Sequence, residues 1–204
     1  MPVIGSPSSN KNLTAAFGKA KAHVGTDGEK RTAYVLDGVF RNDPLTWVIH
    51  DIDVPGYDYA NIDHLILRET TNGTHGVVVD SKLWLPGKYR ITPNGLSRDG
   101  DEFKPGRSAM GLLNMKDSLL RFLGIPSSSF NMLISVWPSK VGKIDMGLMK
   151  KKMNLGNEII MVKGANIVSA VDQSFGSLIG IRSRQSKSFD DVLQATRRLA
   201  RTRS

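Results

Sequence analysis

The chain has 204 residues, 40% of them hydrophobic, which is enough to bury the core of one large domain. It contains no cysteine, so disulfides, thiolate metal sites and cysteine nucleophiles are excluded. The net charge of +9 arises entirely in the second half, because residues 1–99 carry 11 basic and 11 acidic groups whereas residues 100–204 carry 17 and 8. This asymmetry favours an anionic partner for the second half of the chain.

The first 92 residues divide into a polar segment and a β-rich segment. Residues 1–31 are rich in Ser, Asn, Lys, Gly and Ala, and we expect a mobile N-terminal arm. After them, apolar runs separated by Asn-Gly and Pro-Gly turns predict antiparallel hairpins without crossover helices. The expected strands are 33–36, 39–40, 45–54, 62–69, 76–80, 83–85 and 88–91.

The second half alternates between helical and extended patterns. Leucines at helical spacing predict a central helix over 108–123, with Ser108 at its N-cap and Gly124 after its end. A capping box of Ser188 and Asp191 predicts an amphipathic helix near the C-terminus. Strands are expected at 130–137, 158–162, 167–171 and 178–181, and a short helix at 145–153.

Together these elements predict an α+β protein: an antiparallel, β-rich N-terminal half, a central helix and a mixed, basic C-terminal half. A β-sandwich or jelly roll with helical insertions is the alternative. The expected organisation is an arm over 1–31, a single globular domain over 32–181, and a basic C-terminal tail over 182–204 that includes the amphipathic helix.

Acidic and histidine side chains gather between residues 50 and 75. They are His50, Asp51, Asp53, Asp58, Asp63, His64 and His75. Metal ions bind such groups, but in a strand Asp51 and Asp53 point away from His50, and no known metal-site spacing is present. Phosphate-binding loops and nucleophile motifs are also missing from the sequence. We therefore expect structural roles for this region, no cofactor and no enzymatic activity, with a metal-dependent enzyme as a second alternative.

Basic residues form three sets in the second half of the chain, the first of them beside Trp137. One set alone would indicate a solvated face, whereas three sets within 64 residues favour phosphate binding. Trp137 precedes a proline and basic neighbours, so it is the tryptophan best placed for surface stacking. The predicted binding residues are Trp137, Lys140, Lys143, Lys150, Lys151, Lys152, Arg182, Arg184, Lys187, Arg197, Arg198, Arg201 and Arg203.

These features predict a non-enzymatic, self-associating structural protein that binds nucleic acid, with RNA favoured, through its phosphates and without sequence specificity. A peripheral, matrix-type protein of anionic membranes is the alternative. In size, basic charge and lack of cysteine the chain is similar to viral coat and matrix proteins, a similarity of composition only. Because the N-terminus lacks the pattern of a secretory signal, we expect an intracellular protein of the cytoplasm or nucleus, or a virion component.

Overall fold

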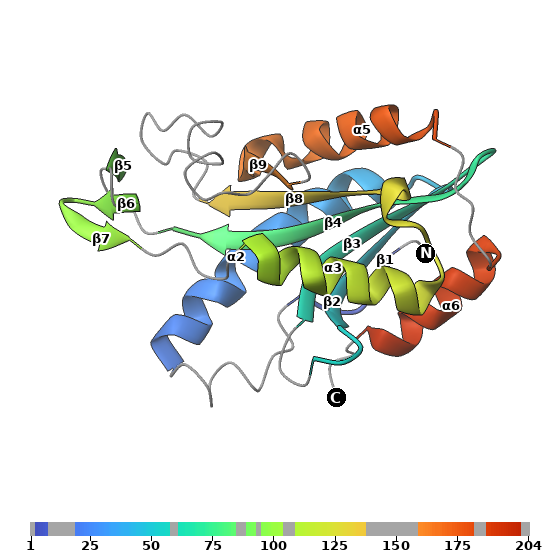
Figure 1. Cartoon of the computed structure of the whole chain (residues 1–204), viewed down its shortest axis with the longest axis horizontal. Coiled ribbons are helices and arrows are strands. Elements are labelled where there is room, and N and C mark those ends of the chain that lie inside the picture. Colours follow the sequence, from blue (N-terminus) through green and yellow to red (C-terminus); the bar gives the residue numbers. More distant parts are fainter. Residues whose placement is uncertain are drawn as a thin grey trace.

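A six-stranded mixed β-sheet forms the centre of the molecule (Figure 1). The computed structural model describes residues 3–7, 19–57, 61–84, 89–92, 95–103, 109–137, 159–181 and 187–200. In spatial order the strands are β1 (Val3–Ile4), β2 (Thr46–Asp53), β3 (Asn61–Thr70), β4 (Gly73–Leu83), β8 (Phe130–Trp137) and β9 (Ile159–Lys163). The β2–β3–β4 pairs are antiparallel, whereas β1–β2, β4–β8 and β8–β9 are parallel.

Helices cover both faces of this sheet. On one face, Leu36 of α2 (Lys19–Phe40) and Phe175 of α5 (Ile167–Leu178) share a hydrophobic core with strand residues such as Val77. On the other face, α3 (Ala109–Leu123) and α6 (Phe189–Leu199) contribute to a second core. The sheet is therefore the middle of three layers, and its central strands are buried on both sides.

A smaller antiparallel sheet projects from the end of β4 (Figure 1). Its strands are β5 (Tyr89–Thr92), β6 (Gly95–Arg98) and β7 (Asp101–Phe103). Together with α3 they occupy the connection from β4 to β8. Because β4 and β8 are parallel neighbours, this connection has to cross from one end of the sheet to the other.

Several sequence predictions are confirmed. The chain is a mixed α/β protein, and the β2–β3–β4 meander, the central helix and strand β8 lie where the pattern placed them. Helix α6 begins at the expected capping box, in which the Ser188 hydroxyl accepts from the Asp191 amide. The expected strand at 76–80 lies within β4, which ends at Leu83, so of the strand expected at 83–85 only the first residue is in β4, and Leu85 lies outside the described residues. The expected helix at 145–153 lies outside the described residues.

The strands predicted at 33–36 and 39–40 are wrong, because both lie in α2. The buried residues of this helix recur at helical spacing. These buried residues include the polar Glu29 and Thr32, so the spacing of apolar residues alone did not reveal the helix. The predicted arm boundary at residue 31 falls inside the same helix, and β1 pairs with β2 in the main sheet.

The strands predicted at 167–171 and 178–181 are also wrong. Residues 167–178 form α5, and 179–181 follow its end. The β-branched residues at the start of this segment favour strands, and they led to the strand prediction. Its full length shows the period of a helix, since the buried residues are Ile167, Ala170, Val171, Ser174, Phe175 and Leu178.

The N-terminal half is not exclusively antiparallel. β1 runs parallel to β2, and α2 lies between them in the sequence. The expectation that no crossover helix fits in this region is therefore corrected. A two-sheet sandwich or jelly roll is also not what the described residues form, because helices rather than a second sheet pack on both faces of the main sheet.

Among the described helices, none has both the length and the apolar composition that a transmembrane segment requires.

The central helix provides a test of the core on the α3 face. Leu119 has no exposed surface. Replacing it with Ala should lower the free energy of unfolding by about 2–5 kcal/mol, because a cavity would remain. Leu45→Ala is the matched control, since that side chain is 57% exposed and its loss should cost less than about 0.5 kcal/mol. Equal losses in urea denaturation would contradict this packing.

Candidate functional site

The structure describes four of the predicted binding residues: Trp137, Lys187, Arg197 and Arg198. The others lie outside the described residues: Lys140, Lys143, Lys150, Lys151, Lys152, Arg182, Arg184, Arg201 and Arg203. The four described residues fall at two separate places in the fold. Lys187 and the two arginines belong to the α6 region, whereas Trp137 ends β8 and contacts α2.

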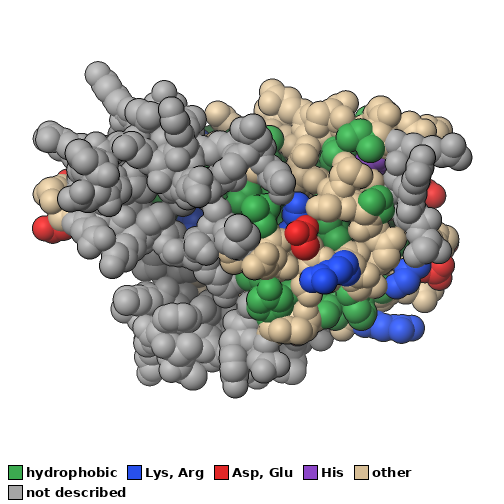
Figure 2. All heavy atoms as spheres, viewed as in Figure 1, with side chains coloured by type: hydrophobic (Ala, Val, Ile, Leu, Met, Phe, Trp, Pro, Cys, Tyr) green, Lys and Arg blue, Asp and Glu red, His purple; other side chains and the backbone are tan. Residues whose placement is uncertain are grey.

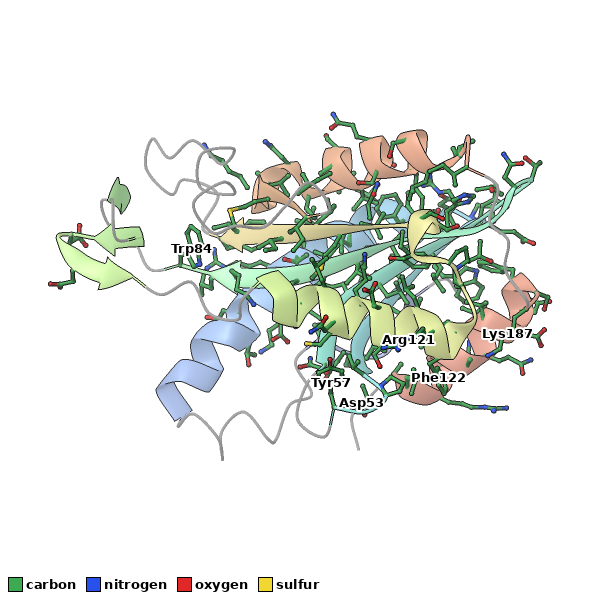
Figure 3. The ribbon with its side chains drawn as sticks, viewed as in Figure 1. Asp53, Tyr57, Trp84, Arg121, Phe122 and Lys187 are labelled. Carbon is green, nitrogen blue, oxygen red and sulfur yellow. The ribbon has the colours of Figure 1, made fainter. Side chains whose placement is uncertain are left out.

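The α6 cations cover apolar side chains. The Lys187 ammonium donates to the Phe122 carbonyl oxygen at 3.0 Å and lies 5.7 Å from the centre of the Phe122 ring (Figure 3). The Arg197 guanidinium lies 5.1 Å from the Trp47 ring centre. Among the side chains that are coloured in Figure 2, Lys and Arg are interspersed with apolar and acidic ones. These contacts give Lys187 and Arg197 a packing role.

Trp137 is held by three elements of the fold. Its indole Nε1–H donates to the Thr32 hydroxyl of α2 at 2.9 Å, and its carbonyl oxygen accepts from the Trp84 amide at 2.6 Å. Its ring lies against Gly164, where an added Cβ would stand 2.1 Å from the indole. Only glycine leaves room for the ring in this position. The indole is therefore fixed in orientation before any partner arrives.

A hollow of about 350 Å³ lies between Trp137 and the outer face of α2. Its other lining residues are Lys30, Arg31, Tyr34 and Val35. Lys30 and Tyr34 are four residues apart, as are Arg31 and Val35, so all of them share one side of the helix. The walls are almost entirely apolar, and the long stems of the basic side chains allow this while their charged ends reach water. We call this feature the Trp137 groove.

The Trp137 groove and the α6 cations lie at opposite ends of the sheet. Trp84, whose amide donates to Trp137, is at the end of β4 from which the small sheet projects, whereas Lys187 and Phe122 are at the other end (Figure 3). The sequence pattern indicated Trp137 but not its neighbours Lys30, Arg31 and Tyr34. The helical spacing of these three residues was the available signal, and it was hidden by the expectation of an arm followed by a strand.

Beneath the groove, a chain of buried hydrogen bonds links α2 to three strands. Thr32 Oγ1 bonds Ser81 Oγ at 2.9 Å, and Ser81 Oγ lies 3.0 Å from His64 Nε2. The Nδ1 atoms of His64 and His50 are 2.8 Å apart, and His50 Nε2 lies 2.9 Å from the Asp37 carboxylate of α2. The chain of contacts therefore leaves α2 at Thr32 and returns to it at Asp37.

Burial and the neighbouring His50 ring lower the pKa of His64 well below its usual value, so this ring is neutral. The Ser81 hydroxyl donates to Thr32 Oγ1, and the neutral His64 ring contacts Ser81 Oγ through Nε2 and His50 through Nδ1. Both imidazoles have no exposed surface, so a substrate cannot reach them in this conformation.

The acidic histidine region does not assemble as one metal site. His75 lies apart from the histidine pair, with its ring nitrogens near Thr70 Oγ1 and the Ile181 carbonyl oxygen. Asp51 accepts from the Asn61 amide, and Asp58 lies outside the described residues. Within the described part of the chain, no three carboxylate or imidazole groups are placed to hold a metal ion.

Glu29 is a buried acid on the inner side of α2. Burial, the largest effect, and the nearby Asp63, Asp51 and Asp80 carboxylates together raise the pKa of Glu29 to about 9, against the lowering effect of the Lys82 ammonium. At neutral pH this carboxyl therefore keeps its proton. Glu29 directly precedes Lys30 and Arg31 in the sequence, so one turn of α2 carries a neutral acid inside and two cations outside.

Comparison with models of known families, with curated proteins and with solved structures finds no match to this chain.

Glu29 should make stability depend on pH. The folded chain holds a proton that the unfolded chain loses above pH 4.5, so the free energy of unfolding should fall by up to about 1.4 kcal/mol per pH unit between pH 4.5 and 9. Glu29→Gln should remove this slope and stabilise the protein at pH 8. Glu69 is exposed, so Glu69→Gln is the control and should leave the slope unchanged. Denaturation at several pH values tests this, and an unchanged slope in Glu29→Gln would contradict it.

Thr32 should be the most sensitive position of the buried hydrogen-bond chain. Thr32→Val keeps the shape but leaves the Trp137 indole N–H without its acceptor, so we expect a loss of about 1–3 kcal/mol in the free energy of unfolding. Thr32→Ser retains the hydroxyl and is the matched variant. Near-ultraviolet circular dichroism should report a reoriented tryptophan in the Val variant only. A Val variant as stable as the Ser variant would rule out this role.

Proposed function

We propose that this protein is a non-enzymatic structural or assembly protein that binds nucleic acid, preferentially RNA, through phosphate contacts at the Trp137 groove. One observation carries the proposal: Lys30 and Arg31 flank a fixed, half-buried Trp137. The basic segment containing Lys140 and Lys143 follows Trp137 directly in the sequence. In the described part of the fold, Lys30 and Arg31 stand beside this aromatic residue.

The charge distribution around the groove supports a polyanion as partner. Glu29, the acid nearest to the two groove cations in sequence, is buried and neutral, so it does not offset their charge. Lysine and arginine side chains bind phosphate without reading base identity, and such binding weakens steeply with salt. Non-specific, backbone-directed binding is the expected consequence.

The α6 cations are a secondary contact in this proposal. Arg197 lies over Trp47, and Lys187 donates to the Phe122 carbonyl, so both already have protein partners. Arg197 and Arg198 lie in the last turn of α6, where their positive charge complements the helix dipole, and Lys187 lies just before the start of this helix. Self-association, as expected of an assembly protein, remains part of the proposal.

The test compares two double variants that each remove two positive charges. Lys30→Gln with Arg31→Gln should weaken binding to single-stranded RNA and reduce the log–log salt slope by about 1.4, at roughly 0.7 per phosphate contact. Arg197→Gln with Arg198→Gln should have a smaller effect on both. Fluorescence anisotropy of a labelled strand at several salt concentrations measures both quantities.

Two results would contradict the proposal. Equal losses in the two variants would mean that overall charge, not the groove, controls binding. Failure of the wild-type protein to bind RNA, together with sedimentation on phosphatidylserine vesicles, would favour the membrane alternative.

A further inference from the structure

The apolar walls of the Trp137 groove are not explained by phosphate contacts. Cations alone are enough to hold a phosphate backbone, yet Tyr34 and Trp137 form much of this hollow. Tyr34 is 82% exposed on α2, where an aromatic side chain gains little from the core of its own protein. The groove therefore has cations at its rim that can bind a phosphate, and aromatic side chains inside that can contact a flat, apolar ligand.

The size of the hollow limits that ligand. About 350 Å³ is near the lower end of the range for small-molecule sites, so one or two rings are enough to fill it. A nucleobase has this size, and its faces stack favourably on tyrosine and tryptophan. In a duplex the faces of each base are covered by its neighbours, whereas an unpaired strand can turn a base outward.

The indole is prepared for stacking. Its N–H is bonded to Thr32 and its ring lies against Gly164, so the ring loses little freedom when a base packs on it. Lys30 and Arg31 stand at the rim, where the phosphates next to an inserted base would lie. Tyr34, four residues from Lys30, can move against the base from the solvent side.

We infer that the Trp137 groove selects single-stranded over double-stranded nucleic acid by stacking an unpaired base between Trp137 and Tyr34. This inference rests on the proposed function and adds the class of nucleic acid to it. Stacking tolerates any base, so the binding stays independent of sequence.

The experiment uses three ligands of about 12 nucleotides, a length within the usual range of single-strand sites. They are a single strand, the matching duplex, and a strand with the same phosphates but no bases. Tyr34→Ser should weaken single-strand binding roughly 5- to 150-fold, corresponding to about 1–3 kcal/mol for one stacked base. It should leave duplex and abasic binding unchanged. A 2-aminopurine base in the single strand should be quenched on binding to the wild-type protein and less so by the variant.

Two control variants separate stacking from other effects. Tyr34→Phe keeps the ring and should retain single-strand affinity. Tyr57→Ser removes a partly exposed tyrosine near α3 and should have no effect.

The possible failures are distinguishable. Equal wild-type affinity for single strand, duplex and abasic strand would overturn the stacking inference and leave phosphate binding intact. An unchanged single-strand affinity in Tyr34→Ser would overturn it as well. Failure to bind all three ligands would overturn the proposed function together with the inference.

Discussion

The hydroxyl of Thr32 is the contact on which the arrangement of α2 depends. It lies within hydrogen-bond distance of Ser81 in β4 and Ser135 in β8, and it accepts from the Trp137 indole. Apolar side chains such as Leu36 and Phe40 attach the helix to the sheet, but hydrophobic contact is not directional and permits sliding. Directional bonds to two strands fix the helix along and across the sheet. Since the site is buried, each bond is stronger than it would be in water, and each loss leaves an unsatisfied group.

Polar groups under a helix are usually unfavourable, and here they are tolerated because each finds a partner or loses its charge. His64 remains neutral, and His50 bridges it to Asp37. Glu29 avoids three neighbouring negative charges by keeping its proton. The same burial makes the inner side of α2 sensitive to pH, while its outer side carries Lys30 and Arg31 in water. The same turn of α2 therefore contacts the sheet on its inner side and carries the groove cations on its outer side.

The sequence predicted those elements that carry a clear apolar pattern or a capping motif. The leucines of α3, the run in β8 and the capping box of α6 each point to the element that forms. Prediction failed for α2 because Glu29 and Thr32 occupy its buried stripe, and hydrophobic periodicity does not count polar residues as core. It failed for α5 because Ile167 and Val171 are β-branched, although the helical period continues to Leu178. Trp137 was found from its neighbours in sequence, whereas Tyr34 becomes its neighbour only after folding.

Net charge also proved an incomplete guide to the site. The positive excess lies after residue 99, yet two described cations of the Trp137 groove, Lys30 and Arg31, come from the half whose net charge is zero. A charged partner responds to the local electrostatic field. Because the buried Glu29 is neutral, the field around the groove is more positive than the number of acidic and basic residues indicates. The end of β8 then places Trp137 beside these cations, immediately before the lysine-rich segment. In this geometry the helix supplies the fixed rim of the groove, and the sheet supplies the aromatic surface inside it.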